Sequence, residues 1–180
     1  MLLSDRDIWA ELESGSLSFI PELDPTQVGP GSIDLHLDKA AKLFRRPPPG
    51  YDEIDLSRVS SKELLDYATE EIDLTGGVYL DRNDFVIGYT QEKVSIPPHL
   101  GGRVEGKSGW ARLGLSIHNT APTIQPGWTG QIALELSNNG FFRLKLSPGI
   151  LICQLLLERL TSEPISGYEG GWQGQTSSSG

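Results

Sequence analysis

The sequence is poor in cysteine: among 180 residues there is one, Cys153. A single cysteine forms no disulfide within the chain, so a disulfide-stabilised secreted fold is excluded, and we expect a reducing, cytoplasmic location. Cys153 lies within the apolar run "GILICQLLLERL", which predicts a small buried core thiol rather than a reactive one.

Long apolar runs and excess positive charge are also missing. No stretch approaches the roughly 18 apolar residues of a membrane-spanning helix, and the start "MLLSDRDIW" is too polar for a signal peptide. The chain has 15 Lys and Arg against 24 Asp and Glu, a formal net charge of −9. Such a surface repels polyanions, so we expect neither nucleic acid nor membrane as a partner. A small anion would need a local cationic cluster, which Arg103, Lys107 and Arg112 offer.

What the sequence does contain is glycine and proline, 21 and 12 residues, which suit short strands and tight turns. "SIDLHL" (32–37) alternates apolar and polar residues and predicts a half-buried strand. "VYL" and "FVIGYT" flank the turn "DRND" and predict a hairpin. We expect further strands at "LSIHNTA", "QIALELS", "RLKLS" and "ILICQLLLERL".

Helices are expected to be few. "SDRDIWAELESG" predicts a helix capped by Ser4 and ended by Gly15, whereas residues 57–74 fit either a short helix or a surface excursion. "FRRPPPGYDE" indicates an exposed loop, and residues 169–180 have the composition of a flexible tail. The chain is therefore expected to form one domain, 1–180, of mainly β class: a barrel with one or two short helices.

The stretch "GGRVEGKSGWARLGL" (101–115) matches the phosphate-binding loop of P-loop NTPases letter for letter. That loop joins a buried strand to a helix, but here "KVSIPPHL" precedes it, and proline cannot donate within a central strand. The P-loop interpretation therefore fails. If "SGWARLG" forms a helical turn, Ser108 would cap it, and Lys107 and Arg112 would face an anion. A capped helix with solvated cations remains the alternative.

The block "VEGKSGWARLGLSIHNTAPTIQPGWTGQIALELSNNG" (104–140) resembles the central block of the dCTP deaminases, members of the trimeric dUTPase superfamily. "LLSDRDI", "SIDLHL", the "PG…I…QL" strand at 148–155 and "WQGQ" at 172–175 follow in family order. The resemblance implies a distorted β-barrel of the dUTPase-like (β-clip) type and a homotrimer with active sites at subunit interfaces. It also implies deamination of dCTP to dUTP and ammonia, supplying dUTP for dUMP and thymidylate synthesis.

This resemblance implies chemistry without zinc, and the sequence agrees. Zinc deaminases need a His/Cys/Cys or Cys₃ site beside H-x-E, which one cysteine and no H-x-E motif cannot build. The three histidines, His36, His99 and His118, lack metal-ligand spacing and are expected to be structural.

The resemblance assigns the catalytic role to Glu135. In "QIALELS" the residues Ile132, Leu134 and Leu136 alternate onto one face, which leaves Glu135 on the other. Taken alone, Glu135 is a solvent-facing strand residue. By resemblance it accepts a proton from the water that attacks C4 of cytosine and passes protons to N3 and the leaving ammonia.

The resemblance also implies a set of substrate-binding residues. The triphosphate would be held at 107–112, with Arg112 reaching across a subunit boundary, and Mg²⁺ would bind through the phosphates and not through protein side chains. Residues 169–180 would then be a lid, and dTTP a possible feedback inhibitor. The implied contacts are Lys107, Ser108, Gly109, Trp110, Ala111, Arg112, Ala121, Gln125, Ala133, Leu134, Gln154, Tyr168 and Gln175.

Three positions depart from the family pattern. Gln125 stands where the family usually has an aspartate that contacts the sugar 3′-hydroxyl, Pro122 replaces a small residue, and Gly171 replaces a lysine. An amide can hydrogen-bond a hydroxyl but cannot act as a base. Lys107 and "QGQ" resemble the bifunctional branch, which converts dCTP to dUMP and pyrophosphate, yet Gln125 favours deamination alone. A dUTPase proper and a non-catalytic regulatory homologue remain alternatives.

Overall fold

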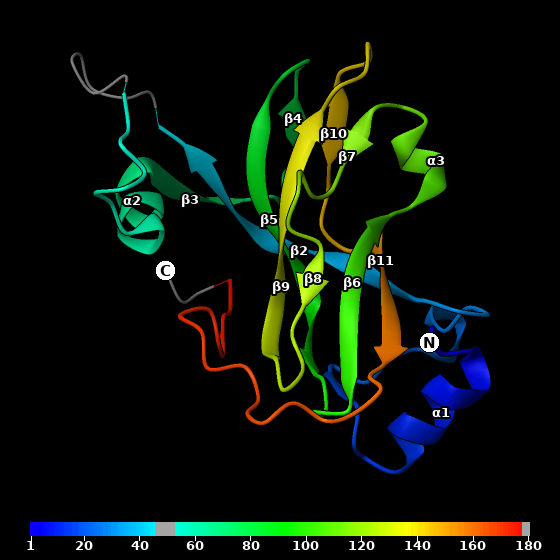
Figure 1. Ribbon diagram of the computed structural model, residues 1–180. Helices are drawn as coiled ribbons and strands as arrows, with labels where there is room; N and C mark the ends of the chain where they lie inside the picture. Colours follow the sequence, from blue (N-terminus) through cyan, green and yellow to red (C-terminus); the bar gives the residue numbers. More distant parts are fainter. Residues whose placement is uncertain (46–52, 178–180) are drawn as a thin grey trace.

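The computed structural model describes residues 1–45 and 53–177, and most of them belong to one curled β-sheet (Figure 1). The nine-stranded sheet has the order β7-β9-β5-β2-β11-β6-β8, with β1 paired to β5 and β3 paired to β2. A two-stranded sheet joins β10 and β4. The strands are β1 (Ser18–Ile20), β2 (Ile33–Phe44), β3 (Thr69–Asp73), β4 (Val78–Leu80), β5 (Phe85–Ser95), β6 (Leu100–Gly106), β7 (Leu115–Ser116), β8 (Thr123–Ile124), β9 (Thr129–Asn138), β10 (Leu144–Leu146) and β11 (Leu151–Arg159).

The predicted mainly β class, with a curled, barrel-like sheet, is confirmed. The expectation of one or two helices was too low, because the chain forms α1 (Asp5–Glu13), α2 (Ser61–Ala68) and α3 (Ser108–Ala111), besides a 3₁₀ turn at Pro25–Gln27. None of the helices in the described part of the chain is long and apolar enough to cross a membrane.

Helix α1 begins and ends where the sequence predicts. Asp7 accepts hydrogen bonds from the main-chain N–H and the hydroxyl of Ser4, at 3.2 and 3.0 Å. Gly15 follows with φ of 73°, a left-handed conformation that glycine adopts without a steric penalty. Ile8 is fully buried and anchors the helix to the barrel.

The core consists of the alternating apolar residues of the central strands. Along β2, Ile33, Leu35 and Leu37 are fully buried, as the alternation of "SIDLHL" predicts. Cys153 on β11 is also fully buried, which raises the pKa of its thiol and confirms the predicted inert core cysteine.

The predicted hairpin between "VYL" and "FVIGYT" is wrong. The turn exists, with Asn83 at φ of 70°, but β4 pairs with β10 and β5 pairs with β9, β2 and β1. The main-chain N–H of Asn83 donates to the carbonyl of Asn138 at 2.8 Å, which directs the chain away from β4 and onto β9. β5 instead forms its long ladders with β9 on one side and β2 on the other, which cover most of its length.

Other boundaries also differ from those predicted. Of "LSIHNTA", Leu115–Ser116 alone is a strand. Residues 57–74 contain the predicted helix, α2, and then the strand β3, which the sequence did not indicate. Most of the predicted loop "FRRPPPGYDE" lies outside the described residues, as do 178–180 of the predicted tail.

Candidate active site

A cavity of about 310 Å³ opens between the outward face of β5 and β9 and the C-terminal segment. It brings together several of the residues singled out from the sequence: Ala121, Gln125, Ala133, Glu135, Tyr168 and Gln175. The side chain of Leu134 lies on the opposite, core face of β9 and is fully buried. The remaining lining residues are Leu65, Ile87, Tyr89, Thr123, Ile124, Trp128, Ile132 and Trp172.

Glu135 sits on β9 with its carboxylate at the cavity. The main-chain N–H of Asn119 donates to its Oε2 at 2.7 Å, which fixes one oxygen. In the ladder with β5, Glu135 lies opposite Ile87 and Ala133 lies opposite Tyr89. Directly opposed side chains on one face are close neighbours, so the carboxylate has an apolar residue on one side and a backbone donor on the other.

The polar side chains that line the cavity differ in charge. Among the described residues that line it, Glu135 is the one carboxylate, and Thr123, Gln125 and Gln175 are neutral. Burial, with smaller contributions from Glu71 and Asp66, raises the pKa of Tyr89 to about 12, so its phenol stays protonated at neutral pH. Among the described lining residues, Glu135 is therefore the one carboxylate that can serve as a base.

Aromatic rings form the end of the cavity nearest the C-terminal segment. The rings of Trp128 and Tyr168 lie 5.5 Å apart. The indole Nε1 of Trp128 is buried and has no hydrogen-bond partner within the described part of the chain. This end of the cavity is suited to packing against flat or apolar groups.

The C-terminal segment is held against β9 by its backbone. The main-chain N–H of Gln131 donates to the carbonyl of Gln175 at 2.8 Å, and the N–H of Gly174 donates to the carbonyl of Thr129 at 2.8 Å. The hydroxyl of Ser177 donates to Asp38 at 2.9 Å. In Figure 1 the segment runs below the barrel and ends beside α2. Residues 169–177 therefore occupy the position expected for a lid. That they open remains a prediction.

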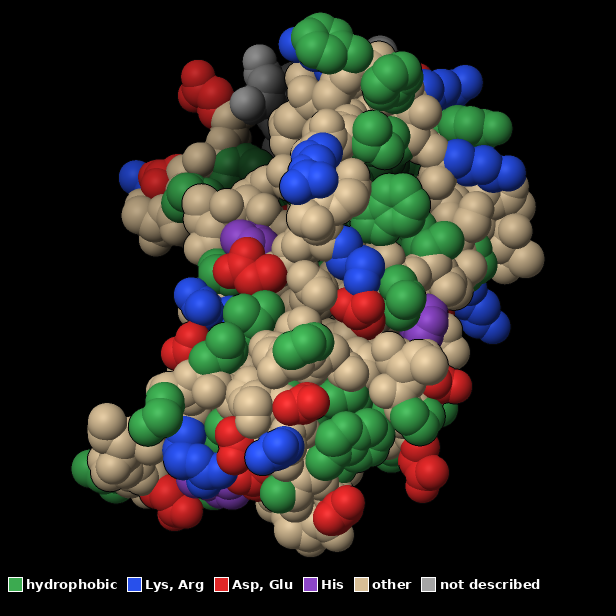
Figure 2. Space-filling view, turned by 90° about the vertical axis from the view of Figure 1, so that its right-hand side faces the viewer, with side chains coloured by type: hydrophobic (Ala, Val, Ile, Leu, Met, Phe, Trp, Pro, Cys, Tyr) green, Lys and Arg blue, Asp and Glu red, His purple; other side chains and the backbone are tan. Residues whose placement is uncertain are grey.

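The residues expected to bind the triphosphate lie outside this cavity. Lys107 to Arg112 follow β6, which pairs with the cavity-lining strand β8, but they do not themselves line the cavity. The expected cap is wrong: Lys107 is the N-cap residue of α3 and Ser108 is its first helical residue. Figure 2 shows this side of the molecule, where Lys and Arg side chains lie among acidic and apolar ones rather than in one cationic patch.

Lys107 and Gln154 meet at Asp34, a residue that the sequence did not single out. The Lys107 Nζ lies 2.5 Å from Asp34 Oδ2, and the Gln154 amide donates to Asp34 Oδ1 at 3.1 Å. The indole of Trp110 donates to the carbonyl of Leu151 at 2.8 Å, which ties α3 to β11. Arg112 is exposed.

Comparison with known proteins decides the family. A family model described as "dCTP deaminase-like" matches residues 2–160. The chain belongs to the dCTP deaminase-like family. It is 42% identical to "dCTP deaminase, dUMP-forming" of Acidothermus cellulolyticus, across 97% of this chain and 91% of that protein. It is 40% identical to the protein of the same name from Streptomyces griseus, with the same coverage.

A solved structure agrees with this family. The 2′-deoxycytidine 5′-triphosphate deaminase of Agrobacterium tumefaciens superimposes with a TM-score of 0.67 at 25% identity. The alignment covers 87% of this dCTP deaminase-like chain and 47% of the solved one, so this chain spans about half the length of that protein. The resemblance drawn from "GKSGWARLG" and "QIALELS" is therefore confirmed at the level of family.

Each histidine of this dCTP deaminase-like chain lies beside a different glutamate. His36 is 2.6 Å from Glu92, and His99 is 2.9 Å from Glu11. His118 is 3.6 Å from Glu105. No group of three His, Cys, Asp or Glu residues arranged to hold a metal ion occurs among residues 1–45 and 53–177.

Several of the residues that line the cavity were not predicted from the sequence. Ile87 and Tyr89 alternate along "FVIGYT", so their shared face was visible, but which strand they would oppose was not. Leu65 enters from α2, whose packing depends on contacts with distant strands. Trp128 sits in the quoted central block without a role assigned to it.

Proposed function

We propose that this protein deaminates dCTP by hydrolysis, with Glu135 as the general base. The observation that carries the proposal is the position of Glu135, the one cavity-lining carboxylate in the described chain, fixed by the N–H of Asn119. A water between this carboxylate and C4 of cytosine would attack C4 as Glu135 takes its proton. The proton passes to N3, the C4–N bond breaks with transfer of the second proton to the amine, and the products are a uracil ring and ammonia.

The proposal includes a subunit neighbour. The triphosphate would be held by Lys107, Ser108 and Arg112, and these do not line the cavity of their own chain. A homotrimer with sites at its interfaces would bring them to the cavity of another subunit. Mg²⁺ would bind through the phosphate oxygens, because it is a hard cation commonly held by substrate phosphates. The single buried cysteine supports a reducing compartment such as the cytoplasm.

The proposed product is dUTP. A second step to dUMP would need a group to orient or activate water at the phosphates, and Gln125 is a neutral amide that cannot serve as a base. The second candidate is a bifunctional enzyme that forms dUMP and pyrophosphate. It is favoured by the name "dUMP-forming" carried by relatives 40–42% identical to this chain.

The experiment is a product assay with dCTP and Mg²⁺, in which nucleotides and pyrophosphate are separated by chromatography. Accumulation of dUTP and ammonia without pyrophosphate is the expected result. Formation of dUMP with pyrophosphate would establish the bifunctional candidate and overturn our interpretation of Gln125. Binding of dCTP without any product would indicate a regulatory homologue. Adding dTTP to the same assay tests feedback inhibition.

A further inference from the structure

Helix α2 turns one face toward the barrel and the C-terminal segment. Lys62, Leu65, Asp66 and Thr69 fall at i, i+3, i+4 and i+7, the spacing of residues that share a helix face. The side chain of Asp66 pairs with Lys42 of β2 at 3.1 Å, and the ammonium of Lys62 lies 6.0 Å from the centre of the Trp172 ring. The hydroxyl of Thr69 donates to the carbonyl of Leu65 at 2.7 Å.

The ion pair to β2 fixes where this face lies. The Lys42 side chain is 6% exposed, so its partner Asp66 is drawn to one position on the barrel wall. The main-chain N–H of Arg45 donates to the carbonyl of Ala68 at 2.8 Å and holds the end of the helix to the same strand. Leu65, between these contacts and Lys62, is thereby directed into the cavity.

Leu65 completes an apolar wall with Ile87 and Tyr89 of β5. Ile87 lies directly opposite Glu135 in the β5–β9 ladder, so the wall starts beside the carboxylate. On the other side of the carboxylate stands the main-chain N–H of Asn119. The surroundings on the two sides of Glu135 therefore differ: apolar side chains lie on one side and a polar backbone group lies on the other.

The two edges of a cytosine ring differ in the same way, one being polar and the other apolar. On one side of C4 lie N3 and the 2-carbonyl, which need hydrogen-bond partners, and on the other lie C5–H and C6–H, which do not. A buried polar atom without a partner is costly, so the polar edge is expected at the backbone side and the C5–C6 edge at the apolar wall.

We propose that α2 forms the wall of the nucleotide pocket that meets the C5–C6 edge of the base, and that Leu65 determines selectivity for substituents at C5. This rests on the proposed function in that it takes the cavity to hold cytosine with C4 at Glu135. The chemical class concerned is the deoxycytidine triphosphates that differ at C5, of which dCTP and 5-methyl-dCTP are the simplest pair.

The test compares kcat/KM for dCTP and for 5-methyl-dCTP in Leu65→Ala, Leu65→Phe and wild-type protein. Leu65→Ala is expected to shift the ratio toward 5-methyl-dCTP by about tenfold or more, the range that one added or missing carbon produces in an apolar pocket. Leu65→Phe is expected to shift it the other way. A ratio unchanged in both variants overturns the proposal.

The matched control is Leu64→Ala, the same substitution one residue earlier. Leu64 points about 100° away around the helix and is not among the residues lining the cavity. The ratio is expected to stay at the wild-type value in this variant, and an equal shift would mean that loosening of α2, and not Leu65, sets selectivity.

Failure of the proposed function gives a different result. Wild-type protein that turns over neither nucleotide refutes the deaminase. The ratio of the two dissociation constants, measured for the same variants by tryptophan fluorescence, then decides the role of Leu65 by the same criteria.

Discussion

The main-chain N–H of Asn119 donates to the carboxylate of Glu135 at 2.7 Å and fixes one of its oxygens at the cavity. The donor comes from the loop after β7 and the acceptor from β9, two neighbours in the sheet. A hydrogen bond to one oxygen orients the carboxylate at the cavity. Such an arrangement suits a base that must accept a proton in one direction.

Glu135→Gln is therefore expected to abolish deamination and to leave nucleotide binding nearly intact. Glutamine keeps the shape and an oxygen that accepts from Asn119, but it cannot take up a proton. Loss of a general base lowers the rate by about 100-fold or more. Ammonia release and dCTP binding would be measured on the same preparation, and loss of binding or folding in this variant would contradict the assigned role.

Gln125→Asp is expected to introduce the second step. The substitution replaces a neutral amide in the cavity with a carboxylate. This carboxylate is able to orient or deprotonate water. We expect pyrophosphate to appear with dCTP as substrate. Gln125→Asn is the control, because it has the shape of the aspartate and no charge. Equal pyrophosphate from both variants would count against an acid–base role at this position.

Gly130→Ala is expected to displace the C-terminal segment. A Cβ at Gly130 would lie 2.7 Å from the carbonyl oxygen of Gln175 and 3.0 Å from its nitrogen, and the φ of 147° is one that side chains rarely adopt. We expect faster chymotrypsin cleavage at Tyr168 or Trp172 and a fall in kcat/KM of about tenfold, because the cavity loses its cover. Gly171→Ala is the control, since nothing lies within 4 Å of its Cβ. A wild-type cleavage rate in Gly130→Ala would refute this role for Gly130.

The sequence predicted best those features that depend on local pattern. Alternation placed Ile33, Leu35 and Leu37 in the core and Glu135 on the opposite face to Leu134 and Leu136, and the structure confirms both. The cap at Ser4 and the stop at Gly15 also depend on neighbours in the chain. These predictions succeed because each feature depends only on residues within a few positions along the chain.

Features that depend on distant pairing could not be predicted. β4 pairs with β10 across more than sixty residues rather than with its neighbour β5, which forms long ladders with β2 and β9. The shared partner of Lys107 and Gln154, Asp34, arises from the order β2-β11-β6. Leu65 reaches the cavity through the ion pair of Asp66 with Lys42. No short-range signal specifies such contacts.

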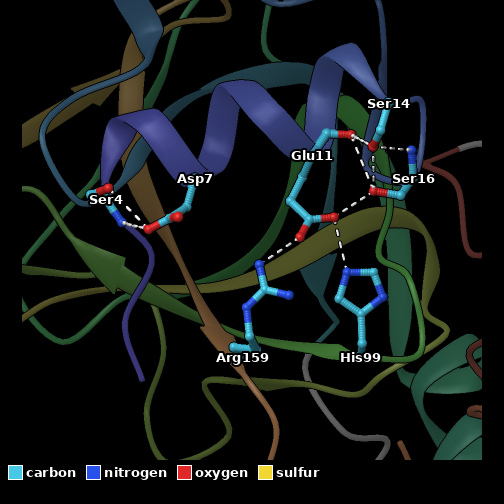
Figure 3. A network of polar contacts seen from close by, with 7 residues as sticks. All are labelled: Ser4, Asp7, Glu11, Ser14, Ser16, His99 and Arg159. Atoms are coloured by element: carbon cyan, nitrogen blue, oxygen red, sulfur yellow. Dashed lines mark hydrogen bonds and ion pairs between the residues drawn. The ribbon is translucent and has the colours of Figure 1, made fainter.

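The polar network under α1 gives a prediction about stability and pH. The carboxylate of Glu11 is 2.8 Å from Arg159, 2.9 Å from His99 and 2.5 Å from the hydroxyl of Ser16 (Figure 3). Burial by itself raises the pKa of this carboxyl. The hydrogen bonds from Ser16 and His99, the charge of His99 and the bond from Arg159 together outweigh burial and leave the pKa below the ordinary 4.5.

Glu11→Gln is expected to destabilise the protein by about 2 kcal/mol at neutral pH, the range for hydrogen bonds to a charged group. A carboxyl whose pKa is lower in the folded state stabilises the fold above its ordinary value, and this contribution is lost as the pH falls through the folded-state pKa. The gap in unfolding free energy between wild type and Glu11→Gln should thus be full at about pH 5 and smaller at about pH 3, measured by urea denaturation. Glu13→Gln removes the same charge from an exposed position of the same helix and is expected to change the free energy of unfolding little. A gap that does not narrow with acid, or one shared equally by Glu13→Gln, would show that the Glu11 network contributes no specific stability.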